Sequence, residues 1–156
     1  PELVQAFAGI GGTVLAGGEL RAELKQLIAF VVSNAAGCRY CQAHTSHSAE
    51  RAGVSEEKIQ AAFEFESSDL FSDAERAALR VALHAGMHPN AVEPEHMKAL
   101  QQFYSDKQCV EIVAVISLFG YLNRWNDTMA TTLEEGPRSF ASDKLAQGGW
   151  DVSKHL

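Results

Sequence analysis

Helix-start signatures constrain the fold of this chain more than any other feature. Residues 72–75 (SDAE) and 105–108 (SDKQ) each place a serine three positions before a glutamate or glutamine. At this spacing the two residues cap the first turn of a helix reciprocally. Ser55 precedes Glu56 and Glu57, and acidic residues in a first turn favour a helix there too. We therefore expect helices that begin near residues 56, 73 and 106.

An apolar repeat predicts a core-facing helix from about residue 20 to residue 36. Its apolar positions follow the i, i+3, i+4, i+7, i+8 pattern of a buried helix face: Leu24, Leu27, Ile28, Val31 and Val32. Gly37 suits the C-terminal end of this helix. The next helix is expected to begin near Cys38 and to stop at Gly53.

The remaining pattern completes an all-α prediction for one domain that spans residues 1–156. Apolar residues at helical spacing precede the glycine pair at 11–12, a helix from residue 73 is expected to end at Gly86, and Pro94 suits the first position of a further helix. A long apolar helix is expected from residue 106 to about residue 135, ended by the Gly-Pro pair at 136–137. The last residues are expected to be irregular, with Trp150 docked on the body.

A weak internal repeat connects two of these helices. Residues 28–33 (IAFVVS) align with residues 112–117 (IVAVIS) at an offset of 84. The repeat suggests two related helical hairpins, of which the first carries a pair of cysteines. Short apolar strings also match by chance, so the repeat alone does not establish a second hairpin.

Composition limits the classes of function. The chain of 156 residues is long enough to bury a core, has a net charge of -7, and carries only 13 basic residues, which are scattered. Nucleic-acid binding depends on clustered Lys and Arg, so we expect no nucleic-acid partner. No apolar run approaches the roughly 20 residues of a membrane span, and no basic, apolar leader opens the chain. Three cysteines without an export signal indicate the reducing cytoplasm.

Cys38 and Cys41 form a CxxC pair in the expected first turn of a helix. Thiols at i and i+3 are close enough for a disulfide, and the unpaired N–H groups of a helix N-terminus stabilise a thiolate. A thiolate reduces a peroxide and becomes a sulfenic acid, which a second thiol converts to a disulfide. His44 lies one turn beyond Cys41 and is the predicted base, ahead of His47. Tyr40 is a candidate to hydrogen-bond a substrate oxygen, with packing as its alternative role.

A zinc site is the main alternative for this segment, because His44 and His47 extend the pair to CxxCxxHxxH. Each step of three residues turns a helical side chain about 60° short of a full turn. Cys38 and His47 therefore drift to opposite faces of the helix, and the four ligands do not converge on one tetrahedral ion. We expect no metal here. Cys109, in the long apolar helix, is expected to be a small buried hydrophobe.

The sequence resembles the AhpD-like alkylhydroperoxidases of the carboxymuconolactone decarboxylase superfamily. The resemblance rests on residues 24–33 (LKQLIAFVVS) and 37–45 (GCRYCQAHT), and residues 117–127 (SLFGYLNRWND) resemble the peroxidase-related members. It implies an all-α fold of helical hairpins that assembles into homo-oligomers such as dimers, trimers or hexamers. Members often carry a further N-terminal stretch, which leaves open that this chain lacks one.

The resemblance also implies a thiol peroxidase cycle that needs no bound cofactor. In this cycle Cys41 attacks the hydroperoxide and Cys38 resolves the sulfenate as a redox-active disulfide. An external thiol or disulfide reductant protein then regenerates the pair.

The chain departs from the family pattern at two positions beside the cysteines. The pattern has a glutamate twelve residues before the first cysteine and a histidine four residues after the second, where this chain has Gln26 and Thr45. Glu23, one turn earlier, and Glu111, on the echoing helix, are the predicted substitutes for the acid. His44 is the predicted substitute for the histidine.

Three functions stay open at this point. The leading one is a thiol-dependent hydroperoxide reductase with antioxidant activity. The second is the lactone decarboxylase chemistry of the superfamily, which does not depend on a CxxC pair. The third is a non-catalytic helical oligomer with zinc at the cysteines.

Overall fold

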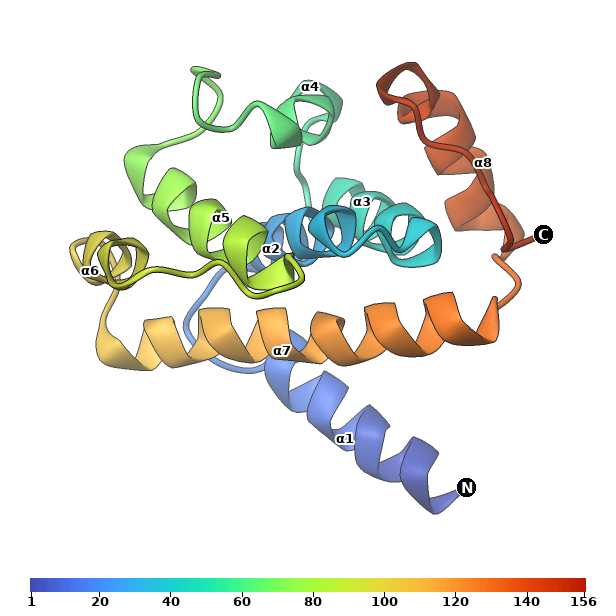
Figure 1. The fold of residues 1–156 in the computed structure, drawn as a ribbon, viewed down its shortest axis with the longest axis horizontal. Helices are drawn as coiled ribbons and strands as arrows, with labels where there is room; N and C mark the ends of the chain where they lie inside the picture. Colours follow the sequence, from blue (N-terminus) through green and yellow to red (C-terminus); the bar gives the residue numbers. More distant parts are fainter.

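The computed structural model describes residues 1–156 and is entirely helical, which confirms the predicted fold class (Figure 1). Eight α-helices and two short 3₁₀ helices follow one another along the chain: α1 (Glu2–Ala16), α2 (Ala22–Ala35), α3 (Arg39–Arg51), α4 (Glu56–Gln60), η1 (Ala61–Phe63), α5 (Asp73–Gly86), α6 (Pro94–Gln101), α7 (Asp106–Met129), α8 (Glu135–Lys144) and η2 (Ala146–Gly148). None of the helices combines the length and the apolar character that a membrane crossing requires.

Helix α2 is the centre of the core. Every residue from Leu27 to Ser33 is buried, so the helix is covered on all sides rather than along the one predicted face. It packs against α3, α5 and α7, and Figure 1 shows it between these helices. Apolar residues all round a helix are typical of such a position. The C-terminal end of α2, where the cysteines follow, therefore lies inside the molecule.

Hydrogen bonds confirm the predicted helix starts. The Ser72 hydroxyl accepts a bond from Glu75 N–H at 3.2 Å, and the Glu75 carboxylate accepts one from Ser72 N–H at 2.9 Å. Ser105 and Gln108 form the same capping box at the start of α7, at 3.3 and 3.0 Å. Ser55 caps α4 with its side chain. The local signals therefore position the starts of α4, α5 and α7.

Two helix boundaries differ from the prediction. Helix α1 runs through the glycine pair at 11–12, because glycine weakens a helix by about 1 kcal/mol relative to alanine without breaking it. The long helix α7 ends at Met129, where Ala130 takes a left-handed conformation with φ 48°. The Gly-Pro pair at 136–137 lies in the first turn of α8 instead of ending a helix. Proline is tolerated there because the N–H group it lacks would have no partner in a first turn.

The C-terminal residues return to the body of the protein. Trp150 is 6% exposed, and its indole N–H donates to the carbonyl of Arg39 at 3.2 Å, which confirms the predicted docking. Further along, Leu133 N–H donates to the carbonyl of His155 at 2.9 Å. The tail therefore covers the start of α3, where the cysteines lie.

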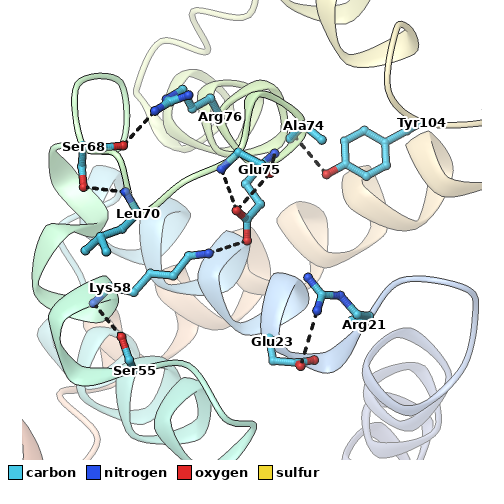
Figure 2. Close-up of polar contacts among 11 residues, drawn as sticks. Arg21, Glu23, Ser55, Lys58, Ser68, Leu70, Ala74, Glu75, Arg76 and Tyr104 are labelled. Atoms are coloured by element: carbon cyan, nitrogen blue, oxygen red, sulfur yellow. Dashed lines mark hydrogen bonds and ion pairs between the residues drawn. The ribbon is translucent and has the colours of Figure 1, made fainter.

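Figure 2 shows polar contacts around the N-terminal part of α5 and the start of α2. Lys58 Nζ lies 2.7 Å from a Glu75 oxygen and so ties α4 to α5. The Tyr104 hydroxyl donates to the carbonyl of Ala74 at 3.0 Å, which connects the segment before α7 to α5. Glu23 lies in the same region, at the end of α2 that is farther from the cysteines.

The two echoing segments are both helical. Residues 28–33 belong to α2 and residues 112–117 to α7, and the two helices pack together. The chain then differs, because α2 ends at Ala35 and turns into α3, whereas α7 continues without a turn to Met129. A turn equivalent to the one that carries the cysteines does not follow residue 117.

Candidate thiol site

A tight turn places Cys38 at the N-cap of α3. Gly37 has a φ of 76°, which glycine adopts without strain, and Cys38 N–H donates to the carbonyl of Ser33 at 3.1 Å. Cys38 Sγ accepts a bond from Cys41 N–H at 3.4 Å. Both thiols are free and buried, with 0% and 2% of their surface exposed. The predicted pair therefore lies at the positive end of α3, inside the protein.

The two thiols differ in acidity. A hydrogen bond from the Cys41 thiol lowers the pKa of Cys38 and outweighs its burial, and the Cys41 N–H group adds to this effect. The same thiol–thiol contact, together with burial and the nearby charge on Cys38, raises the pKa of Cys41 well above its ordinary value. These opposite shifts make Cys38 the more acidic thiol of the pair. This order is the reverse of the attack order that the family resemblance implies.

The C-terminal part of α7 supplies polar side chains that face the thiols. Asn126 Nδ2 donates to Cys41 Sγ at 3.7 Å, and Asn126 Oδ1 accepts a bond from the Thr131 hydroxyl at 2.9 Å. The carboxylate of the adjacent Asp127 also acts on the pair, because its negative charge, as a smaller effect, raises the pKa of both cysteines. Helix α7 thus contributes one hydrogen-bond donor and one charge to the site.

His155 reaches the thiols from the C-terminal tail. Its side chain is buried, and Nδ1 lies 2.9 Å from the carbonyl oxygen of Thr131. Since a carbonyl only accepts, Nδ1 carries a proton. Nε2 has no hydrogen-bond partner and lies 3.8 Å from Asp127 Oδ1. The side-chain donor atoms of Cys38, Asp127 and His155 all lie within 4.8 Å of one another, so a carboxylate and an imidazole lie beside the Cys38 sulfur.

These three side chains are also the ones that could hold a metal ion at this site. A thiolate, a carboxylate and an imidazole are donor types that bind zinc. The set differs from the CxxCxxHxxH arrangement considered for the sequence, since His44 contacts Glu134 and the ring of His47 lies 5.3 Å from that of Phe140.

The predicted base, His44, lies at the edge of the site and makes no hydrogen bond to either thiol. Its Nε2 is 2.7 Å from one Glu134 oxygen, and the other oxygen accepts a bond from the Tyr40 hydroxyl at 3.1 Å. Burial opposes ionisation of Glu134, but its own N–H group and these two partners hold its pKa below the usual value. The Tyr40 ring is 4.5 Å from the His44 ring and 5.8 Å from that of His155. Tyr40 therefore contacts both histidines.

The structure does not bring the predicted acids, Glu23 and Glu111, to the thiols. Glu23 lies near the start of α2 (Figure 2). Cys38 follows the other end of that helix. The Glu111 carboxylate accepts hydrogen bonds from backbone N–H groups between α1 and α2. It also precedes Asn126 by about 22 Å along α7, at 1.5 Å per residue. These positions correct the expected placement of both acids, because the helices carry them away from the pair.

The two departures from the family pattern hold groups that exchange no proton. The Thr45 hydroxyl is buried and donates to the carbonyl of Cys41 at 2.7 Å, and Gln26 is half-buried on α2. Asp127 and His155 are the titratable groups that approach the thiols instead. His155 lies at the far end of the chain, so no local spacing indicated it. Asp127 lies in the segment 117–127 that resembles the peroxidase-related members, but nothing in its local pattern indicated a contact with the thiols.

Comparison with known proteins places the chain in a family. The model of the carboxymuconolactone decarboxylase family matches residues 1–84, which is more than half of the chain. YdfG, an uncharacterized protein of Bacillus subtilis (strain 168), is 30% identical over 104 residues, which cover 65% of this chain and 68% of YdfG.

Solved structures share the fold. A cysteine-to-alanine variant of the debrominase Bmp8, in complex with 2,3,4-tribromopyrrole, is 40% identical and matches with a TM-score of 0.87 over 92% of this chain and 76% of Bmp8. The alkylhydroperoxidase AhpD core of an uncharacterized peroxidase-related protein from Ralstonia eutropha JMP134 is 23% identical, with a TM-score of 0.68 over 82% of this chain and 68% of that protein. The chain therefore belongs to the carboxymuconolactone decarboxylase family and has its AhpD-like all-α fold.

Proposed function

We propose that this chain is a thiol-dependent reductase that converts a hydroperoxide to an alcohol with its Cys38–Cys41 pair. The observation that carries the proposal is the polarised pair: the buried Cys38 sulfur accepts a hydrogen bond from the Cys41 N–H group, and the Cys41 thiol lowers the pKa of Cys38. Family membership supports an enzymatic role. The pair supplies both electrons, so the chemistry needs no bound cofactor.

Cys38 is the proposed attacking residue. Its thiolate attacks the outer oxygen of the hydroperoxide and breaks the O–O bond, which leaves a sulfenic acid on Cys38. The departing alkoxide takes the proton of Cys41. The Cys41 thiolate then attacks the Cys38 sulfur, forms the disulfide and releases hydroxide. An external dithiol then reduces the disulfide and supplies two electrons and two protons. Cys38 returns to its thiolate form by losing one of these protons, which converts the hydroxide to water.

Asp127 and His155 are the proposed proton-handling groups of this cycle. Nε2 of His155 has no hydrogen-bond partner and lies 3.8 Å from Asp127 Oδ1, so this ring nitrogen is free to take up and release a proton beside the pair. His155 is the proposed relay for the Cys38 proton: Nε2 takes the proton that Cys38 loses and donates it to the hydroxide as it leaves the Cys38 sulfur. His155 thus takes the role that the sequence prediction gave to His44.

Peroxide consumption with an excess of a dithiol tests the proposal. We expect Cys38→Ser to abolish turnover. Cys41→Ser should stop after one sulfenic acid has formed, which mass spectrometry detects as a dimedone adduct on Cys38. Cys109→Ser is the control, because Cys109 lies on α7 away from the pair and should not affect turnover. Full turnover by Cys38→Ser would contradict the proposal, and a dimedone adduct on Cys41 of that variant would support the attack order implied by the family.

Reductive debromination is the second candidate, favoured by the 40% identity to the debrominase Bmp8. The same thiolate would attack a bromine atom, so that the C–Br electron pair stays on carbon and takes a proton. Cys41 would then displace bromide from the Cys38 sulfenyl bromide to form the disulfide. Bromide release from brominated pyrroles, measured beside peroxide consumption with the same variants, decides between the two substrates.

Two further readings of the family and the cysteines have direct tests. Lactone decarboxylation that survives alkylation of both thiols would favour the lyase chemistry in the family name. One zinc ion per chain after purification without chelators would favour a metal site, and Cys38, Asp127 and His155 would be its expected ligands.

A further inference from the structure

A cavity of about 220 Å³ lies beside the thiol site, between the C-terminal ends of α2 and α5 and the second half of α7. Asn123 and Asp127, one turn apart on α7, belong to its wall. His88 and Arg124 are exposed residues of the same wall, and their side chains approach to 3.4 Å. Asp127 is shared with the thiol cluster. The cavity therefore ends one side chain away from Cys38.

Asn123 is the unexplained residue of this wall. Its side chain is 3% exposed, yet neither Nδ2 nor Oδ1 has a hydrogen-bond partner. A buried amide without partners destabilises a folded protein, so packing alone does not favour an asparagine at this position. Its neighbours at i+3 and i+4, Asn126 and Asp127, both face the thiols. The free amide thus lies on the same side of α7 as the reactive pair.

We propose that this cavity is the substrate pocket and that the Asn123 amide binds the reactive polar group of the substrate. The inference rests on the proposed function and specifies its substrate class. The ligand must be compact, because the cavity is smaller than the roughly 300–1,000 Å³ of a drug-sized site. It must also donate one hydrogen bond to Oδ1 and accept one from Nδ2.

A hydroperoxide group matches this pattern. Its O–H group would donate to Asn123 Oδ1, and its inner oxygen would accept from Nδ2. The N–H group of a brominated pyrrole would pair with Oδ1 alone. A small alkyl hydroperoxide is therefore the better fit, and tert-butyl hydroperoxide is the substrate for the kinetic test.

Asn123→Leu tests the amide. Leucine has nearly the same shape without the polar atoms, so the thermal midpoint of unfolding should stay or rise. The kcat/KM for tert-butyl hydroperoxide should fall at least about tenfold through a higher KM, as expected for a lost substrate hydrogen bond. The alkylation rate of Cys38 should not change. A lower thermal midpoint with an unchanged KM would show a structural asparagine and overturn the inference.

Gly120→Leu tests the cavity. Gly120 belongs to the cavity wall, and a Cβ added to it meets no atom within 4 Å. A leucine there would fill the cavity, and it favours a helix more than glycine does. Gly9→Leu is the matched control, because an added Cβ at Gly9, on α1, is equally free and lies outside the cavity. The kcat/KM should fall in Gly120→Leu only, and equal values in the two variants would count against the pocket.

Pyrazole probes the pocket without turnover, because it carries a donor and an acceptor on adjacent atoms. The side-chain NH₂ signals of Asn123 in ¹⁵N-labelled protein are identified by their absence from the spectrum of Asn123→Leu. Pyrazole should shift these signals in the wild-type protein and should not shift them in Gly120→Leu. Pyrazole binding without any turnover would support the pocket while the proposed function fails. Turnover with the same KM in both variants and no pyrazole shift would overturn the pocket while the function stands.

Discussion

At the scale of single residues, Asp127 has two opposing effects on the thiol site. Its negative charge disfavours the Cys38 thiolate, while its carboxylate lies beside His155, the proposed proton donor. The charge alone would make the pair a weaker nucleophile. The presence of Asp127 is therefore better explained by its contact with His155, the proposed proton relay.

Asp127→Asn separates these two effects. Removal of the charge should lower the pKa of Cys38 further, so that alkylation by iodoacetamide reaches its half-maximal rate at a lower pH. Peroxide turnover should fall on the order of 100-fold, as for loss of an acid–base group. Lys154→Ala removes the 2.9 Å ion pair to Asp127 but keeps the carboxylate, so it controls for a loosened tail and should not lower the midpoint.

The wild-type protein gives the reference for this experiment. The pKa of Cys38 is lowered by the hydrogen bond from the Cys41 thiol. The thiolate population grows as the pH rises through this lowered pKa, so the alkylation midpoint should lie below the pKa of an unperturbed thiol. A midpoint above that value, or an Asp127→Asn variant with a higher midpoint, would contradict the assignment of Cys38 as the thiolate.

The residues of the thiol site divide into those that sequence can predict and those that only the fold brings together. Cys38 and Cys41 act within one helical turn, so their spacing was sufficient to predict the pair. Asp127 and His155 reach the pair from the end of α7 and from the tail, through contacts that no local pattern encodes. The predicted partner His44 was adjacent in sequence, but its ring turns to Glu134 instead.

At the scale of elements, Lys25 joins α1 to α2. It lies in the buried part of α2 with 1% exposure, and its Nζ donates to the carbonyls of Val14 and Gly17 at the end of α1. A cation at this end of a helix is favourable. The Glu111 carboxylate, 3.8 Å from Nζ, pairs with the N–H groups of the following turn. The Lys25–Glu111 ion pair therefore provides hydrogen-bond partners for the carbonyl groups at the end of α1 and for the N–H groups of the turn that follows.

Lys25→Met should lower the free energy of unfolding by about 3 kcal/mol, the lower end for removal of one partner of a buried ion pair. The lower end applies because Glu111 keeps its backbone partners. Urea denaturation measures this change. Lys107→Met is the matched control, since the exposed Lys107–Glu19 pair should contribute little. Equal midpoints for wild type and Lys25→Met would show that α1 does not depend on this contact.

Helix starts were more predictable than helix ends in this chain. The serine caps of α4, α5 and α7 act through bonds within four residues, so their sequence signature is complete. The Gly-Pro pair at 136–137 is ambiguous, because proline fits after a helix and also within the first turn of the next one. Packing of α8 against α3 decides the outcome, and that contact joins segments about ninety residues apart in the sequence.

At the scale of the whole molecule, α1 and the outer side of α7 leave apolar surface uncovered. Large apolar side chains with exposures of 42% or more gather on these two helices: Leu3, Val4, Ile10, Val110, Val113, Tyr121, Trp125 and Met129. Figure 1 shows α1 projecting from the body and contacting α7. An apolar groove of about 430 Å³ lies between the two helices. Surface of this kind is typical of subunit interfaces, so we expect this face to join copies of the chain in a homo-oligomer.

Ile10→Asp tests this assembly. Ile10 is 54% exposed and lines the groove between α1 and α7, so a carboxylate there would be buried without a partner in an interface and should shift the protein to monomers. Gln5→Asp adds the same charge to α1 outside the groove and should leave the assembly intact. Light scattering behind size-exclusion chromatography measures the mass of each variant. Because the thiols are already enclosed within one chain, peroxide turnover should survive dissociation, and its loss in monomeric Ile10→Asp would show that a second copy completes the site.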